Sequence, residues 1–260
     1  MENQNIQTEQ LQLNSTTRDG NIRSVAEIMK SVQNKFDQKS EVIFDGYICF
    51  RCKEKYTIEK RERDTPRHWE GKELCGKCKF EDEMKLRTAR WTAICPPLYQ
   101  NTDRLKLPDE EARKSYDKIQ LHKFQGRGLV VHGLTRRGKT RAIWDRIKIG
   151  YMKTGTTPKY CLGSMFSVLI SESFEEHQTS KILKDFSETP LLFFDDIGQM
   201  IFTERVQECL FTILELRCAY LRPTIFTMND IGQTLKDKFS GNRGDAFVGR
   251  LKEFCEIIKF

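Results

Sequence analysis

A phosphate-binding signature constrains this chain more than any other feature. The signature has the form G-x4-G-K-T and consists of Gly133, Leu134, Thr135, Arg136, Arg137, Gly138, Lys139 and Thr140. An apolar run at 129–132 precedes it, and an amphipathic stretch follows. The glycines of such a loop let backbone N–H groups close around phosphate oxygens, and the next helix start adds partial positive charge. The context favours a nucleotide-binding loop over a solvent-exposed turn.

Individual residues of this loop have distinct expected roles. Lys139 is expected to reach the β- and γ-phosphates, and the Thr140 hydroxyl is expected to hold Mg2+. We expect the whole loop and the residue after it to contact the nucleotide: Gly133, Leu134, Thr135, Arg136, Arg137, Gly138, Lys139, Thr140 and Arg141.

Two later strand patterns end in polar residues. Four apolar residues at 191–194 lead into Asp195 and Asp196, as in a buried central strand that delivers carboxylates to a ligand. We expect Asp195 to hold Mg2+ and Asp196 to orient or deprotonate an attacking water. A further apolar strand at 223–228 ends at Asn229, whose amide is either a water-positioning group or an ordinary turn former.

The pattern of elements predicts an α/β fold for the C-terminal part. From Gly126 onward, apolar strands alternate with helical patterns, which indicates a mostly parallel sheet with helices on its faces, as in a P-loop NTPase. We expect strands near 129–133, 158–162, 191–195 and 223–228, and helices near 139–152, 164–177 and 203–220. The expected domains are a core at 126–260, a helical linker at 81–125, a cysteine module at 41–80, and 1–40 as a disordered tail with a short amphipathic helix from Ile22 to Phe36.

Composition excludes some protein classes. The chain of 260 residues opens without an apolar signal region and contains no stretch of 18 uninterrupted apolar residues, so we expect neither secretion nor a membrane span but a cytoplasmic protein of a bacterial or phage-infected cell. The formal charge of +7 permits contact with polyanions, but 37 acidic residues lie among 44 basic ones. Charge alone therefore does not indicate a nucleic-acid ligand.

The cysteine module contains a metal-binding pattern. Cys49, Cys52, Cys75 and Cys78 form a C-x2-C-x22-C-x2-C array. Two such turns complete a tetrahedral shell of four thiolates, which selects Zn2+ and leaves no open position for a substrate, so we expect a structural, zinc-ribbon-like module. A redox C-x-x-C pair is the chemical alternative, and His68 is a possible replacement ligand. Basic and aromatic residues interleave in this module, so protein docking, single-stranded nucleic acid binding and a purely structural role all stay open.

The motifs together resemble a known family. The segments GLTRRGKT, LLFFDDIG and LRPTIFTMND, followed by residues 244–251, look like the AAA+ ATPases of the DnaC/DnaI helicase-loader and IstB transposition-ATPase group over about residues 95–260. The resemblance implies ATP and Mg2+ as cofactors, Asn229 as sensor 1, and Arg250 as an arginine finger that acts on a neighbouring subunit. Arg217 also matches a family arginine. Only Lys252 and Lys259 among basic residues follow Arg250, so we expect neither a sensor 2 arginine nor an obvious lid domain.

The resemblance implies a function with alternatives. We expect a slow, oligomer-stimulated ATPase that acts in DNA replication as a helicase loader, with Asp196, Asn229 and Arg250 as catalytic residues. Its expected partners are a replicative helicase, which DnaI-like proteins contact through an N-terminal zinc domain, single-stranded DNA, and further copies of the chain. An IstB-like regulator of transposition and a non-hydrolysing, nucleotide-sensing zinc adaptor are the alternatives.

Overall fold

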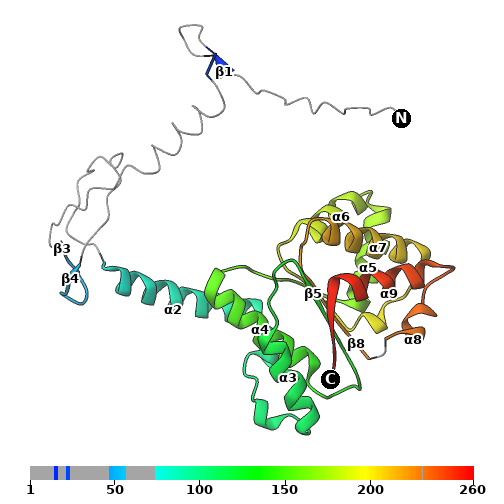
Figure 1. The fold of residues 1–260 in the computed structure, drawn as a ribbon, viewed down its shortest axis with the longest axis horizontal. Coiled ribbons are helices and arrows are strands. Elements are labelled where there is room, and N and C mark those ends of the chain that lie inside the picture. The colour runs from blue at the N-terminus through cyan, green and yellow to red at the C-terminus, as the bar shows by residue number, and fades with distance from the viewer. Residues whose placement is uncertain (1–14, 17–21, 24–46, 57–73, 230) are drawn as a thin grey trace, which may run out of the picture. The chain divides into compact units, whose positions relative to one another are not determined.

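The computed structural model describes residues 15–16, 22–23, 47–56, 74–229 and 231–260 (Figure 1). The chain divides into two compact units, the first ending at Glu81 and the second running from Asp82 to Phe260. In the part of the chain that the structure describes, no helix combines the length and apolar character that a membrane span requires.

The first unit contains two short antiparallel pairs. Strand β1 (Ser15–Thr16) pairs with β2 (Ile22–Arg23), and β3 (Tyr47–Ile48) pairs with β4 (Lys55–Tyr56). The sequence predicted an amphipathic helix from Ile22, but Ile22 lies in a strand; the part of that helix after Arg23 and most of the expected tail lie outside the described residues. His68 also lies outside them.

A five-stranded parallel sheet forms the centre of the second unit. Its strands are β5 (Gly128–His132), β6 (Lys159–Leu162), β7 (Leu192–Asp195), β8 (Thr224–Met228) and β9 (Cys255–Lys259), in the order β6-β7-β8-β5-β9. All neighbouring pairs are parallel. The predicted α/β fold and its four predicted strands are confirmed. Strand β9 was not predicted, because Glu256 and Lys259 interrupt its short apolar pattern at the edge of the sheet.

Helices cover both faces of this sheet (Figure 1). The helices of the second unit are α3 (Glu110–Leu121), α4 (Lys139–Thr154), α5 (Gly163–Glu175), α6 (Thr179–Glu188), α7 (Glu204–Ala219), α8 (Gln233–Lys236) and α9 (Arg243–Phe254). Helix α2 (Gly76–Ile94) begins in the first unit and ends in the second. Short 3-10 turns are η1 (Pro97–Tyr99), η2 (Arg104–Lys106) and η3 (Ile197–Gln199). Helices α4, α5 and α7 match the three that the sequence predicted.

Alternating strand residues build two separate cores. Leu129 and Val131 of β5 face a core that includes Trp144 of α4, whereas Val130 faces the opposite core with Phe194 of β7. Helices α5, α6, α7 and α9 cover the core that contains Val130 and Phe194. Because successive side chains of a strand point to opposite faces, a continuously apolar strand is stable only when both faces are covered.

Helix α3 belongs structurally to the sheet unit. Asp109 caps its start by accepting a hydrogen bond from the backbone N–H of Ala112 at 2.8 Å, which satisfies one of the free donors of the first turn. The helix packs against α4 and buries Ala112, Tyr116 and Ile119 in the same core as Leu129. Residues 110–121, which we expected within a helical linker, therefore support the sheet face next to the phosphate-binding loop.

Arg217 is a structural residue of α7. Its side chain is 0% exposed. It donates to the Thr224 hydroxyl at 2.7 Å, and also to the carbonyl oxygens of Phe186, Ser187, Thr189 and Pro223. Burial lowers its pKa to about 10, so the guanidinium stays charged at neutral pH. Arg217 thus links the end of α6 to the beginning of β8. Its side chain is not accessible to a ligand from solvent.

Candidate functional site

The loop between β5 and α4 has the backbone shape that phosphate binding requires. Gly133 and Gly138 have φ values of 136° and 106°, in the left-handed region that side chains rarely adopt. A Cβ atom on Gly133 would lie 2.2 Å from the Phe260 carbonyl oxygen, so only glycine fits between the loop and the end of β9. Gly138 is the N-cap of α4. The helix therefore directs its first backbone N–H groups, and its partial positive charge, toward the loop.

Lys139 lies at the centre of this loop and is buried. Its ammonium nitrogen donates to the carbonyl oxygens of Gly133 at 2.7 Å and Leu134 at 2.8 Å, and to Asn229 Oδ1 at 3.2 Å. These three oxygen atoms hold the ammonium group inside the loop. A phosphate group is a stronger partner for a buried ammonium than carbonyl dipoles are.

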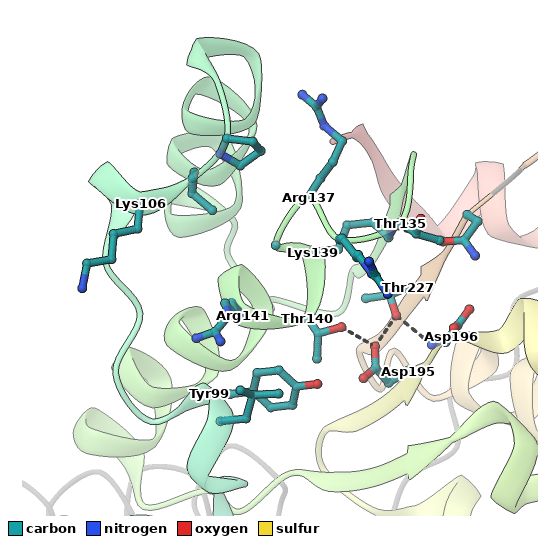
Figure 2. A pocket seen from close by; sticks show the side chains of 16 residues that line it. Tyr99, Lys106, Thr135, Arg137, Lys139, Thr140, Arg141, Asp195, Asp196 and Thr227 are labelled. Carbon is teal, nitrogen blue, oxygen red and sulfur yellow. Dashed lines mark hydrogen bonds between the residues drawn. The ribbon is translucent and has the colours of Figure 1, made fainter.

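The carboxylate of Asp195 accepts hydrogen bonds from hydroxyl groups on three different elements. Thr140 of α4 donates to Oδ1 at 2.9 Å, Thr227 of β8 donates to the same oxygen, and Tyr160 of β6 donates to Oδ2 at 3.1 Å. Figure 2 shows Thr140 and Thr227 on either side of Asp195. Burial, followed by the Asp195 charge, raises the pKa of Tyr160, so its phenol stays protonated and can donate. The structure brings together the two residues that the sequence predicted as magnesium ligands, Thr140 and Asp195.

Asp196 has an unusual backbone and an unpaired oxygen. Its φ of 51° lies in the left-handed region, which aspartate tolerates better than most residues. The backbone N–H donates to the Thr227 hydroxyl at 2.8 Å, whereas the buried Oδ1 accepts no hydrogen bond from the described residues. Burial, and then the charge of Asp195, raises the pKa of this carboxyl group. Such a carboxylate suits binding or deprotonating a water molecule.

These residues line one cavity of about 470 Å³. Asn229 follows β8 and reaches the cavity beside Lys139; its backbone oxygen also accepts from the Gly133 N–H at 3.0 Å. The lining residues shared with the sequence prediction are Thr135, Arg136, Arg137, Gly138, Lys139, Thr140, Arg141, Asp195, Asp196 and Asn229. Gly133 and Leu134 shape the loop but do not line the cavity.

Six further residues that the sequence did not identify also line the cavity. They are Leu98, Tyr99, Lys106, Leu107, Pro108 and Thr227. The Arg141 guanidinium lies 5.9 Å from the centre of the Tyr99 ring, and Arg137 donates to Asp109 at 2.7 Å. Tyr99 and Leu107 are far from the loop in sequence and carry no motif, so no sequence signal marks them. Thr227 precedes Asn229 by two residues, and strand periodicity places both side chains on one face.

Arg250 does not line this cavity. It lies on α9 and donates to Glu253 at 2.9 Å and to both carboxylate oxygens of Glu215. The hydrogen bonds with Glu215, then that with Glu253, raise its pKa.

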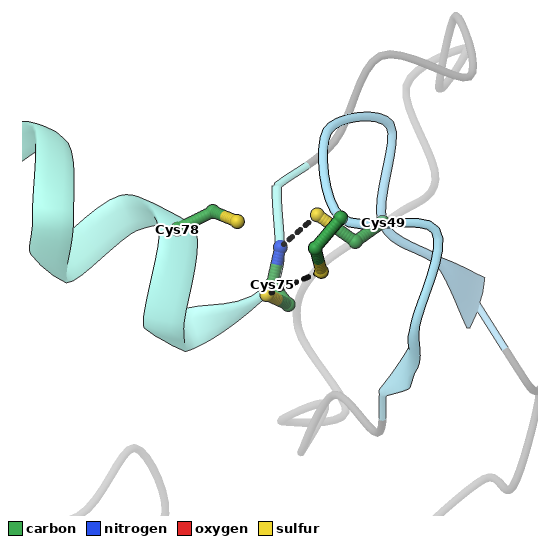
Figure 3. Close-up of side chains that lie close together, drawn as sticks. Cys49, Cys75 and Cys78 are labelled. Atoms are coloured by element: carbon green, nitrogen blue, oxygen red, sulfur yellow. Dashed lines mark hydrogen bonds between the residues drawn. The ribbon is translucent and has the colours of Figure 1, made fainter.

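The four predicted zinc ligands gather in one cluster in the first unit (Figure 3). The Sγ atoms of Cys49, Cys52, Cys75 and Cys78 all lie within 4.8 Å of one another. A turn after β3 brings Cys49 and Cys52 together, and the Cys75 N–H donates to the Cys49 sulfur at 3.3 Å. None of the four forms a disulfide. A tetrahedral zinc ion with Zn–S bonds of about 2.3 Å requires sulfur atoms roughly 3.8 Å apart, so the cluster fits a zinc-binding module.

Comparisons with known proteins support the fold of the second unit. No family model matches the sequence, and no curated protein matches it. Among solved structures, the DnaC helicase loader has a TM-score of 0.50 and 21% identity over 66% of this chain and 98% of its own. A DnaI structure has a TM-score of 0.51 and 19% identity over 59% of this chain and 87% of its own.

A replication initiator is also similar. DnaA bound to AMPPCP and single-stranded DNA has a TM-score of 0.51 and 18% identity over 64% of this chain, which spans only 50% of that protein. At these identities the likeness establishes the fold and not the activity. The second unit is therefore similar in fold to the DnaC helicase loader, DnaI and DnaA structures, and the chain also has a four-cysteine cluster that fits a zinc-binding module.

Proposed function

We propose that this chain is an ATP-hydrolysing replication protein that acts as a helicase loader. The observation that carries the proposal is the arrangement of Lys139, Thr140 and Asp195 around one cavity on an AAA+ fold. A phosphate-binding loop and a buried carboxylate at the end of a neighbouring strand supply what a nucleoside triphosphate with magnesium requires. The likeness to a protein described as a helicase loader supports the biological role.

Each group of residues in the proposed site has a separate chemical role. The loop N–H groups and Lys139 bind the phosphates, with Arg136, Arg137 and Arg141 adding positive charge along the cavity wall. Thr140 and Asp195 hold Mg2+, which supplies positive charge to the phosphate oxygens when it is bound. Asp196, whose buried Oδ1 accepts no hydrogen bond from the described part of the chain, accepts the proton of the attacking water, while Asn229 orients that water.

The proposed zinc module recruits the partner. A module of residues 41–80 is too small to bury a sufficient core, so a metal ion supplies the missing stability. Ile48 and Phe50 are exposed on its described surface, and the Lys53 ammonium lies 4.8 Å from the centre of the Phe50 ring. Exposed apolar side chains beside a cation suit docking of a protein partner, for which we propose a replicative helicase. Single-stranded DNA binds the ATPase part of the proposed assembly.

Replacing a cysteine of the cluster is expected to remove the metal. Cys78→Ser leaves three thiolates, and a structural zinc site needs all four ligands to hold its ion. We expect one zinc ion per wild-type chain and less than about a tenth of that in the variant after dialysis against a mild chelator. Elemental analysis of purified protein measures this. Cys209→Ala, which changes a buried cysteine of α7, is the matched control and should keep its zinc. Equal zinc content in the wild type, Cys78→Ser and Cys209→Ala would refute the assignment of the four cysteines as zinc ligands.

Arg250→Ala is expected to separate nucleotide binding from hydrolysis. In the proposed assembly Arg250 leaves Glu215 and approaches the ATP of a neighbouring subunit, where it stabilises charge on the transferring phosphate. The variant should bind ATP normally and lose roughly 10³-fold or more of the turnover of the assembled protein. Phosphate release measured at rising protein concentration, with and without single-stranded DNA, tests both points.

Arg243→Ala provides the control for this experiment. Arg243 also lies on α9 and pairs with a glutamate of α7, Glu208, at 2.9 Å, so its loss removes a comparable surface ion pair. Unchanged turnover in assembled Arg250→Ala would show that Arg250 is not the finger. Undetectable hydrolysis by the wild type under all conditions would favour the nucleotide-sensing adaptor, and filaments on duplex DNA without helicase binding would favour the transposition regulator.

A further inference from the structure

We propose that Tyr160 is a positioning residue that fixes the metal-binding carboxylate of Asp195. Tyr160 belongs neither to the phosphate-binding loop nor to the acidic strand end, and it does not line the cavity. Its hydroxyl nevertheless donates to Asp195 Oδ2 at 3.1 Å. The inference rests on the proposed nucleotide function and adds a residue to it.

The Tyr160 ring is held in place by an aromatic cluster. Tyr160 lies on β6, in register with Phe193 of the adjacent strand β7, and Leu162 is in register with Asp195. The ring centre lies 5.1 Å from that of Trp144 and 5.3 Å from that of Phe193. Trp144 is in turn 5.8 Å from Trp91. Because packed rings have few alternative rotamers, the phenol hydroxyl is held in one position, within hydrogen-bond distance of Asp195 Oδ2.

The two carboxylate oxygens of Asp195 have different partners. Oδ1 accepts from Thr140 and Thr227, whereas among the described residues Tyr160 alone donates to Oδ2. A carboxylate that is anchored through a single oxygen can still rotate about its Cβ–Cγ bond. Anchors on both oxygens, from strands on either side of β7, remove that freedom before any ligand arrives.

This anchoring decides how Asp195 meets a metal ion. The hydroxyl hydrogen of Thr140 points to Asp195, so the lone pairs of its oxygen are directed elsewhere and are available to a cation in the cavity. Asp195 is 3% exposed; its Oδ1 accepts two hydroxyl donors and its Oδ2 accepts one, from Tyr160. Together these donors hold the carboxylate in one orientation toward the metal or its water shell. Partners of a metal-binding group typically change metal affinity by about 10- to 100-fold when they are removed.

Tyr160→Phe tests the role of the hydroxyl without removing the ring. We expect the Mg2+ concentration for half-maximal binding of a fluorescent, slowly hydrolysed ATP analogue to rise roughly 10-fold. Affinity for the same analogue in the presence of a chelator should not change, because the loop and Lys139 bind the phosphates without the metal. Titrations use the full chain, and ligand-free melting curves verify that each variant is folded.

Tyr151→Phe is the matched control. Tyr151 is 4% exposed in the same aromatic cluster, 5.4 Å from Trp91, and has no contact with Asp195. It should show the wild-type Mg2+ requirement. A Tyr160→Phe protein with an unchanged Mg2+ requirement, or one that loses metal-free and metal-dependent binding equally, overturns the inference. If the wild type itself shows no Mg2+-dependent nucleotide binding, the proposed function fails instead, so the two failures are distinguishable.

Discussion

Lys139→Ala is expected to weaken ATP binding by roughly 2 to 5 kcal/mol, or about 30-fold at least, because it removes a buried charge from the phosphate-binding loop. In the free protein this ammonium donates to the carbonyl oxygens of Gly133 and Leu134 and to Asn229 Oδ1. A triphosphate offers this ammonium an anionic oxygen, which is a stronger acceptor than a carbonyl or amide oxygen. Isothermal titration of wild type and variant with ATP and Mg2+ measures the difference.

Lys153→Ala controls for the loss of a positive charge on the same helix. Lys153 lies exposed in the last turn of α4, at the end opposite to the loop. Its replacement should leave ATP affinity within about a factor of two, since surface charges at that distance are screened. Equal losses of affinity in the two variants would indicate a general electrostatic effect and not a specific phosphate contact.

Arg217→Ala is expected to lower the free energy of unfolding by about 3 to 5 kcal/mol. The variant leaves the carbonyl oxygens of residues 186, 187, 189 and 223 without the donor that Arg217 gives them, and it opens a cavity between α6 and β8. Chemical denaturation followed by circular dichroism measures the change. Because Arg217 is buried away from the cavity, ATP affinity of the folded fraction should stay unchanged.

Thr212→Ala, at an exposed position of the same helix, is the comparison for this experiment. It should alter stability by no more than about 0.5 kcal/mol. If Arg217→Ala were as stable as Thr212→Ala but had lost ATP binding, Arg217 would have to be reassigned from the core to the functional site.

The sequence predicted the part of the site that depends on local motifs. The loop, Asp195, Asp196 and Asn229 were identified because each directly follows a buried apolar strand, and parallel strands place their carboxyl ends at one edge of a sheet. The cysteine pairs were identified because metal ligands have fixed spacing. In both cases short-range chemistry restricts the residue types at neighbouring positions.

Residues that act through tertiary contacts could not be found in this way. Tyr99 and Leu107 line the cavity and also pack in the core that contains α3 and α4, and that packing depends on apolar residues spread over several elements. Tyr160 reaches Asp195 only through the pairing of β6 with β7. Strand β9 was missed because edge strands tolerate charged residues, so its pattern is weak.

The central claim is that ATP is bound at the β5–α4 loop opposite Asp195. Calorimetric titration of the full chain with ATP measures this most directly, with Mg2+ present and absent and with Lys139→Ala in parallel. We predict one ATP per wild-type chain, tighter binding with Mg2+, and little or no saturable binding by the variant. Binding by Lys139→Ala with wild-type affinity, or no binding by the wild type, would contradict the account.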